Sequence, residues 1–298
     1  MKPPADDPGS DAEPPRAAAA LTAAVQALTA AAADSPRLTA EALLAHVLGL
    51  SRAQMLARPE HRLAPEQHRV FTELVTRAAH GEPLAYLTGR REFHGLEFAV
   101  DRRVLVPRPE TELLVDRALA CLDTLPPAAD PHVLDMGTGS GCIAVTVAVK
   151  RPRARVTAVD LSEDALAVAR LNAARHGVAG RVSFFRSDLL ESLRLTRASF
   201  HLLCANLPYI PSATACRLPV ARHEPLLALD GGPDGLLWIR RLLVDAPRVM
   251  QPGGRLLLEI DDTTGPAARA AAQAAFPAAQ VAVHPDLAGL DRIVEISL

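Results

Sequence analysis

Glycines at every second position mark the segment with the clearest chemical meaning, Asp135-Met-Gly137-Thr-Gly139-Ser-Gly141. It joins an apolar run typical of a buried strand to an apolar run typical of a helix. Glycine lets the backbone turn tightly and approach a ligand, and the helix that follows offers free N–H groups. The spacing is not that of a dinucleotide fingerprint, whose third glycine would stand at Cys142, and no Gly-Lys-Ser/Thr follows as in a P-loop. A turn without a ligand is the alternative, but the pattern favours a ligand-binding turn.

Carboxylates follow the next two predicted strands. Asp160 closes the strand expected at 155–160, nineteen residues after Gly141, where a carboxylate can hold two ribose hydroxyls. Asp188 follows the strand expected at 181–187, where it could accept from an adenine amino group, and Leu189 beside it could pack on the ring. Either aspartate alone could instead be a cap. Together with the glycine turn, they indicate an adenosine-containing cofactor.

The fourth predicted strand, 200–205, ends in Asn206-Leu207-Pro208-Tyr209, called the acceptor loop below. An amide nitrogen is a poor nucleophile because its lone pair is delocalised, so acceptors must hold its N–H groups with the lone pair aimed at an electrophile. The Asn206 side-chain oxygen and the Leu207 carbonyl are two such acceptors, and Pro208 restricts Leu207 to extended conformations. Tyr209 can wall the acceptor side chain. A plain turn after a strand is the alternative, but after the cofactor signals the loop indicates alkylation of an amide.

With these residues, the chain resembles the HemK/PrmC family of protein-(glutamine-N5) methyltransferases, which modify the Gly-Gly-Gln loop of peptide chain release factors. The resemblance runs from about Leu21 to Leu298. Its most diagnostic segment is Val106-Pro-Arg-Pro-Glu-Thr-Glu112, which lines the acceptor site in the family. Further matching segments are Ser35-Pro-Arg-Leu38, Leu43-Leu-Ala-His-Val-Leu-Gly49, Tyr86-Leu-Thr-Gly89, Arg91-Glu-Phe93, Glu224-Pro225, Ala228-Leu229, Gly231-Gly-Pro-Asp-Gly-Leu236, Pro252-Gly-Gly254 and Asp286-Leu-Ala-Gly-Leu-Asp-Arg292.

The resemblance implies specific roles for residues of this sequence. It implies that Asn206, Pro208 and Tyr209 are catalytic and that Asn206–Tyr209 holds the substrate glutamine. Arg108 could orient the substrate backbone, or it could pair with Glu110 or Glu112. No metal is expected. The implied S-adenosyl-L-methionine site consists of Gly137, Thr138, Gly139, Ser140, Gly141, Asp160, Asp188, Leu189 and Asn206.

The sequence departs from the family pattern at a few positions. Leu207 stands where the family usually has proline. The backbone carbonyl of residue 207 is retained, but the restriction of its φ angle by a proline ring is absent. Leu189 stands where an aromatic residue is common, which weakens the expected stacking on adenine. Asp261 and Thr264 replace a usual glycine and glutamine. These changes leave room for an altered substrate.

Helical signals fill the first third of the chain. Residues 1–16 are rich in Pro, Asp and Gly and are expected to form a disordered tail. Apolar residues recur at helical spacing from 17 to 33, Ser35 before Pro36 is an expected N-cap, and a third helix fits Pro65 to His80. We therefore expect residues 17–89 to form an N-terminal helical domain and residues 90–107 a β-hairpin linker. With the family resemblance, the helical domain is expected to be the substrate-recognition domain.

Strands and helices alternate over 108–298, the expected methyltransferase domain. Strands are predicted at 132–136, 155–160, 181–187, 200–205 and 255–260, and helices at about 112–125, 142–150, 162–177 and 236–250. This alternation is typical of right-handed βαβ units around a mostly parallel sheet. We expect an α/β fold, namely a class I (Rossmann-like) S-adenosylmethionine-dependent methyltransferase domain with a small N-terminal helical bundle.

Composition excludes several classes of function. The net charge of −2 among 298 residues gives no electrostatic footprint for coating a phosphate backbone, so direct nucleic-acid binding is not expected. Four cysteines form no Cys-x-x-Cys pair, which disfavours a zinc site and a disulfide framework. No apolar run suits a bilayer and no signal peptide is legible, which predicts a cytoplasmic protein without membrane contact. A monomer is expected.

The predicted function is methyl transfer from S-adenosylmethionine to the glutamine side-chain nitrogen of release factors. Three alternatives stay open at this point. A nucleic-acid methyltransferase could use the same loop on an exocyclic base amine. A glutamine methyltransferase for a ribosomal protein would share the same site. A cofactor-binding module that has lost catalysis is compatible with Leu207.

Overall fold

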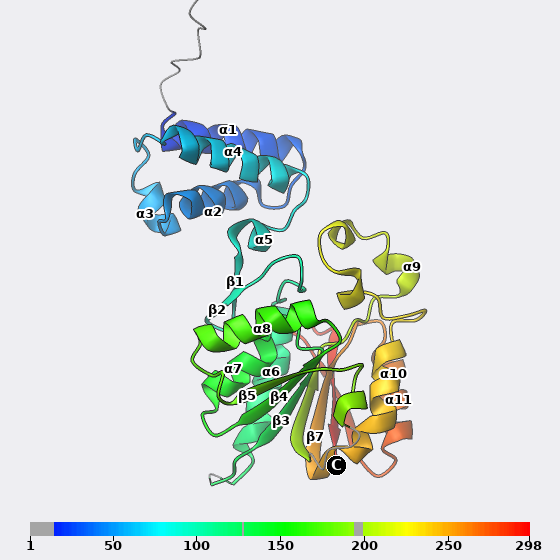
Figure 1. Ribbon diagram of the computed structural model, residues 1–298. Helices are drawn as coiled ribbons and strands as arrows, with labels where there is room; N and C mark the ends of the chain where they lie inside the picture. Colours follow the sequence, from blue (N-terminus) through cyan, green and yellow to red (C-terminus); the bar gives the residue numbers. More distant parts are fainter. Residues whose placement is uncertain (1–14, 127, 194–198) are drawn as a thin grey trace, which may run out of the picture. The chain divides into compact units, whose positions relative to one another are not determined.

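The computed structural model describes residues 15–126, 128–193 and 199–298. The chain divides between Thr88 and Gly89 into two compact units (Figure 1). Most of the expected N-terminal tail, residues 1–14, lies outside the described residues. Its last two residues belong to the first unit, since Arg16 bridges to Arg62 and the Pro15 carbonyl accepts from the Leu63 N–H at 3.1 Å. The tail therefore cannot extend to residue 16.

The first unit is helical, as predicted. It packs small and aliphatic side chains, among them Ala24, Leu28 and Leu44, around one aromatic, Phe71. Its helices are α1 (Ala17–Ala30), α2 (Pro36–Leu48), α3 (Arg52–Leu56), α4 (Pro65–Ala79) and α5 (Leu84–Thr88).

The start of α2 differs in one respect from the expected N-cap. Pro36 does occupy the first helical turn, but Ser35 has φ 46° and its side chain makes no capping hydrogen bond. A left-handed backbone turns the hydroxyl away from the N–H groups that it would cap. At α3 a serine does cap: Ser51 accepts from the Gln54 N–H at 3.2 Å, and the Gln54 side chain accepts from the Ser51 N–H at 2.9 Å.

The second unit begins with the predicted hairpin, which is shorter than expected. Strands β1 (Arg90–Phe93) and β2 (Leu96–Ala99) pair antiparallel across a two-residue turn, His94-Gly95, with φ values of 52° and 76°. Positive φ at both central residues is typical of tight hairpin turns. Because the turn lies at 94–95, the strands end at Ala99 and residues 104–106 form no strand.

A seven-stranded sheet forms the centre of the second unit, in the order β5-β4-β3-β6-β7-β9-β8. The first five strands in this order are parallel, while β9 runs antiparallel to both neighbours. The five parallel strands are those predicted, although β5 is one residue shorter at each end and β7 begins at Met250 rather than at residue 255. Strands β8 and β9 were not predicted. The strands are β3 (His132–Met136), β4 (Arg155–Asp160), β5 (Val182–Arg186), β6 (Phe200–Ala205), β7 (Met250–Glu259), β8 (Gln280–Pro285) and β9 (Asp291–Ser297).

Helices cover both faces of this sheet (Figure 1). Helices α6, α7 and α8 lie together on one face, and α10 and α11 on the other. The helix expected at 236–250 ends at Asp245, because Pro247 interrupts it, and Met250 already belongs to β7. These helices are α6 (Glu110–Asp123), α7 (Cys142–Lys150), α8 (Glu163–Arg175), α10 (Leu237–Asp245) and α11 (Gly265–Ala275), with the short α9 (Ser212–Ala215) in the loop after β6.

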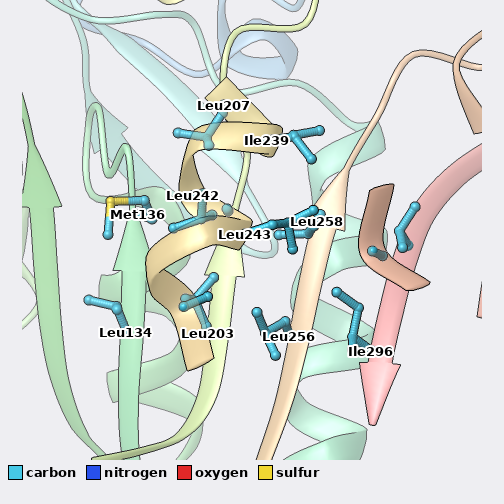
Figure 2. Packing of buried hydrophobic residues seen from close by; sticks show 14 of the residues in the cluster. Leu134, Met136, Leu203, Leu207, Ile239, Leu242, Leu243, Leu256, Leu258 and Ile296 are labelled. Atoms are coloured by element: carbon cyan, nitrogen blue, oxygen red, sulfur yellow. The ribbon is translucent and has the colours of Figure 1, made fainter. Parts of the chain in front are cut away.

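The core between the sheet and α10 is aliphatic. Figure 2 shows Leu242 and Leu243 of α10 over Leu203 and Leu256 of the sheet, with Leu207 at the upper end of this layer. The acceptor loop is thus fastened to the core by one of its own side chains. Among the described residues, no helix is long and apolar enough to cross a membrane.

Candidate active site

A cavity of about 170 Å³ lies at the carboxyl ends of the parallel strands. This edge, outside the ends of the strands, is where open α/β sheets bind ligands. Its lining includes both chemical motifs of the sequence, the glycine turn and the acceptor loop. The lining residues are 103–105, 107, 108, 111, 136–140, 142, 143, 160–162, 165, 187–189, 206–208, 225, 227, 228 and 238.

The glycine turn is held against the neighbouring strand. The N–H groups of Gly137 and Thr138 both donate to the Val159 carbonyl, at 2.8 and 2.9 Å. Gly139 has φ 55°, and a Cβ there would meet nothing within 4 Å, so its backbone faces open space. A Cβ on Gly137, by contrast, would lie 3.0 Å from Cδ2 of Leu207. The turn therefore leaves room for a ligand at Gly139 and contacts the acceptor loop at Gly137.

Gly141 differs from the expected cofactor contact. It does not line the cavity, and a Cβ there would lie 3.1 Å from that of Ala169 on α8. With φ 81°, it lets α7 begin close beside α8. Helix packing, rather than a ligand, requires this glycine.

Two aspartates support the glycine turn. Asp160 lines the cavity, with Oδ2 accepting from the Gly139 N–H at 2.8 Å and Oδ1 from the Ser162 N–H at 2.9 Å. Burial raises the pKa of Asp160, although these backbone hydrogen bonds act to lower it. Each oxygen keeps a further lone pair for a hydroxyl. Asp135 lies fully buried beneath the turn, where Oδ2 accepts from Thr138 Oγ1 at 2.6 Å, and burial raises its pKa to about 7.

The third strand brings Asp188 and Leu189 to the cavity, as expected. Asp188 is not free there, because Oδ2 accepts from Arg241 Nη2 at 2.9 Å. The Arg241 guanidinium in turn lies 5.1 Å from the ring centroid of Trp238, a residue of the cavity wall. Leu189 has φ 48°, an uncommon backbone conformation for a side chain of this size.

Asn206 and Leu207 of the acceptor loop are fixed in different ways. Asn206 lines the cavity, and its Nδ2 donates to Thr111 Oγ1 at 2.8 Å. This contact leaves the Asn206 side-chain oxygen available as an acceptor. Leu207 is 5% exposed and belongs to the core, so its side chain secures the loop while its carbonyl remains part of the loop backbone.

Tyr209 takes a different position from the one expected. It is not among the residues that line the cavity, and its hydroxyl donates to Glu259 Oε1 at 3.3 Å. Glu259, at the end of β7, has no exposed surface, and burial raises its pKa to about 7. Burial, with Glu259 nearby, also raises the pKa of Tyr209. The phenol therefore faces the protein interior behind the loop rather than the cavity.

A second segment, residues 229–236, braces the acceptor loop from outside. The Gly231 N–H donates to the Ile210 carbonyl at 2.8 Å, and the Ile210 N–H to the Leu229 carbonyl at 3.1 Å. A Cβ on Gly231 would lie 2.6 Å from Cα of Tyr209, and one on Gly235 would lie 2.3 Å from the backbone carbonyl oxygen of Tyr209. The glycines of this bracing segment are therefore required by the close approach of two backbones.

Arg108 pairs with neither Glu110 nor Glu112, the partners considered from sequence. Its Nη2 donates to Glu224 Oε1 at 2.8 Å, while Glu224 Oε2 accepts from the Val106 N–H at 3.2 Å. The Glu224 side chain is fully buried and that of Arg108 is 35% exposed at the cavity. The distant glutamate thus holds the arginine at the wall of the site.

The sequence did not single out three residues at the cavity or directly behind it, namely Thr111, Trp238 and Glu259. Thr111 does lie within the segment 106–112 that resembles the family's acceptor site, but its contact with the distant Asn206 is not visible in the sequence. For Glu259 the signal was a charge in the otherwise apolar run Leu256-Leu-Leu-Glu-Ile260. Among the described residues, no group of three or more His, Cys, Asp or Glu side chains could hold a metal ion.

Comparison with known proteins accounts for both units. The model of the PrmC N-terminal domain matches residues 19–89, and that of the methyltransferase small domain matches residues 114–218. The release factor glutamine methyltransferase of Moorella thermoacetica is 45% identical, over 92% of this chain and 95% of its own length. Those of Chlorobaculum tepidum and Deinococcus radiodurans are each 42% identical, over 87% and 92% of this chain and 89% and 95% of their own lengths. The chain belongs to the release factor glutamine methyltransferase family.

Proposed function

We propose that this protein transfers a methyl group from S-adenosyl-L-methionine to the side-chain amide nitrogen of the glutamine in the Gly-Gly-Gln loop of peptide chain release factors. One observation carries the proposal: a cavity bounded on one side by the glycine turn and Asp160, and on the other by Asn206, Leu207 and Pro208. A cofactor site and an amide-binding loop thus share one space.

The residues of the cavity fit S-adenosylmethionine. The open space at Gly139 allows a ligand to approach the backbone, and Asp160 offers a carboxylate suited to ribose hydroxyls. Leu161 and Leu189 provide apolar wall on which an adenine could pack. When bound, this cofactor supplies a methyl group on a positively charged sulfur, open to attack by a nitrogen lone pair.

The acceptor loop would prepare the glutamine nitrogen. The Asn206 oxygen and the Leu207 carbonyl would each accept one N–H of the substrate amide, so that its lone pair points at the methyl carbon. As the new N–C bond forms and the methyl–sulfur bond breaks, the nitrogen loses one proton to solvent. Because alkylation makes the amide acidic, proximity and alignment suffice and a strong general base is unnecessary.

The helical unit would recognise the body of the release factor, because a glutamine side chain alone supplies little specificity. The near-neutral chain, with a net charge of −2, suits a protein partner. We therefore propose a cytoplasmic monomer whose direct partner is the release factor, with no nucleic acid and no membrane.

The proposal is tested by incubating the protein with methyl-labelled S-adenosylmethionine and a release factor. Label should reach the wild-type factor and not a factor whose loop glutamine is replaced by alanine. Label that never appears, or that ignores the replacement, contradicts the proposal.

Replacement of Asn206 tests the amide clamp separately. Asn206→Ala should abolish turnover while cofactor affinity stays within roughly tenfold, because the lost hydrogen bond belongs to the acceptor side. Turnover is measured by label transfer and affinity by calorimetry. Turnover equal to that of the wild type would refute the clamp.

A further inference from the structure

An arginine behind the cavity wall contacts one of the carboxylates that line the cavity. Arg241 of α10 is not among the lining residues, and its Nη2 donates to Asp188 Oδ2 at 2.9 Å. The two side chains are 41% and 35% exposed, and an ion pair as exposed as this one has little orienting effect by itself. A second contact is needed to hold the pair in one geometry.

Trp238 provides this second contact. The Arg241 guanidinium lies over its indole ring, with Cζ 5.1 Å from the ring centroid. The two residues are three positions apart on α10, so their side chains share one face of the helix. The ring attracts the guanidinium and restricts its position, while N–H groups at the edge of the guanidinium can still donate to a carboxylate.

The indole ring is itself held in place. Trp238 Nε1 donates to the carbonyl of Asp230 at 2.8 Å, and the Asp230 carboxylate accepts from the Gly232 N–H at 2.9 Å. The ion pair at the cavity is thus linked through the indole to the bracing segment. This series of contacts restricts the carboxylate to one orientation.

We propose that Arg241 is a positioning residue that makes the cavity selective for adenine, by fixing Asp188 with Oδ1 toward the base. The inference rests on the proposed function, in which an adenosine cofactor fills the cavity. An ionised carboxylate only accepts hydrogen bonds and has about four lone pairs, so the contact at Oδ2 leaves Oδ1 for the exocyclic amino group of adenine. Hypoxanthine has a carbonyl oxygen in place of that amino group, and two acceptors that face each other repel.

The selectivity depends on the orientation of the carboxylate as well as on its presence. Without Arg241, the Asp188 side chain could turn. It could then accept from the ring N–H that hypoxanthine has beside its carbonyl group, and adenine would lose its advantage.

Calorimetry with two ligands tests the role of Arg241. S-adenosylhomocysteine and S-inosylhomocysteine differ only in the base and have the same charge, so effects on the rest of the cavity cancel in the ratio of their Kd values. The wild type should bind the adenine compound about tenfold more tightly or better. Arg241→Met removes the charge and the donors, and this preference should fall to about threefold or less. An unchanged preference in Arg241→Met would overturn the proposal.

Arg240 provides the matched control. It precedes Arg241 on the same helix, but its Nη2 donates to Asp234 Oδ2 at 2.6 Å, and neither Arg240 nor Asp234 belongs to the described lining of the cavity. Arg240→Met should therefore keep the preference of the wild type for adenine. If Arg240→Met loses as much preference as Arg241→Met, the effect comes from the loss of any charge on α10, and the proposal fails.

Asp188→Asn tests the orientation directly. The guanidinium has donors only, so it should take the amide oxygen and leave the NH₂ group to face the base. The preference should then reverse, with the hypoxanthine compound bound more tightly than the adenine compound. If Asp188→Asn keeps the preference of the wild type, this side chain does not contact the base and the proposal is wrong.

These outcomes separate the inference from the proposed function. If the wild type binds S-adenosylhomocysteine and labels the loop glutamine but does not distinguish the two bases, the function stands and the role of Arg241 is wrong. If the wild type binds neither compound, the proposed function itself has failed. Circular dichroism of each variant confirms that an altered preference does not reflect unfolding.

Discussion

Leu207 has two roles at one position of the acceptor loop. Its side chain packs in the aliphatic core (Figure 2). It also lies against the glycine turn, where a Cβ on Gly137 would lie 3.0 Å from its Cδ2. Its carbonyl belongs to the proposed amide clamp. A proline, which the resemblance described above gives as usual at this position, would fix φ but fill less of the core. Leu207 therefore adds packing to the core where a proline would add backbone restriction.

Substitution at position 207 should separate these roles. Leu207→Pro and Leu207→Ala both shorten a buried side chain and should each cost about 2–4 kcal/mol of unfolding free energy. Only proline restores the φ restriction, so Leu207→Pro should have the higher kcat of the two. Urea unfolding and label transfer measure the two effects. Equal kcat values for both variants would show that restriction at this position is irrelevant.

Asp135 should make stability depend on pH. Its folded-state pKa of about 7 lies above the value of about 3.9 for an unfolded chain, so the folded state binds this proton more tightly. Its stabilising effect is complete below pH 4 and is lost as the pH rises through 7, by about 1.4 kcal/mol per pH unit between the two values. The side chain of Asp135→Asn cannot ionise, so this variant does not lose stability in this way as the pH rises.

The measurement is urea unfolding of both proteins from pH 5 to 8. The stability of Asp135→Asn relative to the wild type should increase steadily from pH 5 to 7 and then level off. Groups that do not interact with Asp135 are present in both proteins and cancel in the difference. A constant difference across this range would mean that the buried carboxyl group keeps an ordinary pKa.

Site residues were predictable from sequence where the backbone alone decides their place. Asp160 and Asn206 follow strands whose ends share one edge of the sheet, so their meeting at the cavity could be foreseen. The direction of Tyr209 could not, because it depends on Glu259 and the bracing segment, which return from later in the chain. Local sequence contains no information on such partners.

At the scale of elements, prediction succeeded where local signals agree with the fold. Strands β3, β4 and β6 have the expected bounds, because their apolar runs end at glycine, aspartate or asparagine. Helix α7 also has the expected bounds, from the glycine turn to Lys150, two residues before Pro152. Strand β8 could not be recognised in this way. Its residues are all at least partly exposed, since it lies at the edge of the sheet.

The bracing segment offers a test at this scale. Gly235→Ala would place a methyl group 2.3 Å from the backbone carbonyl oxygen of Tyr209. The acceptor loop must then shift, and kcat/KM should fall at least tenfold. Gly253→Ala is the matched control, because Gly253 has φ 77°, close to the 78° of Gly235, and a Cβ there meets nothing within 4 Å. The measurement is label transfer by both variants. If kcat/KM falls equally in both, the loss comes from the strain of alanine at positive φ and not from contact with the acceptor loop.

At the scale of the whole molecule, the two units have separate cores. The described lining of the cavity lies entirely between Arg103 and Trp238, within the second unit. Helical periodicity predicted a separate N-terminal unit, and the chain divides between Thr88 and Gly89, whereas the hairpin belongs to the second unit. Sequence cannot show this last point, because the hairpin contacts α8 through the distant Asn172.

Removal of the first unit should separate binding from recognition. A protein of residues 89–298 should bind S-adenosylmethionine with a Kd within threefold of that of the full chain, because it keeps the whole described lining. It should transfer label to the release factor at least a hundredfold more slowly, because the proposed recognition domain is missing. Calorimetry and label transfer measure the two. Full activity of the shortened protein would assign recognition to the second unit.

Trp238 gives this molecule a built-in optical probe. It is the only tryptophan of the chain, it lines the cavity, and its Nε1 donates to the carbonyl of Asp230 in the bracing segment at 2.8 Å. All tryptophan emission therefore originates at the wall of the site and none in the helical unit. The tryptophan fluorescence of the unlabelled protein should therefore change when the cavity is occupied or when the bracing segment unfolds.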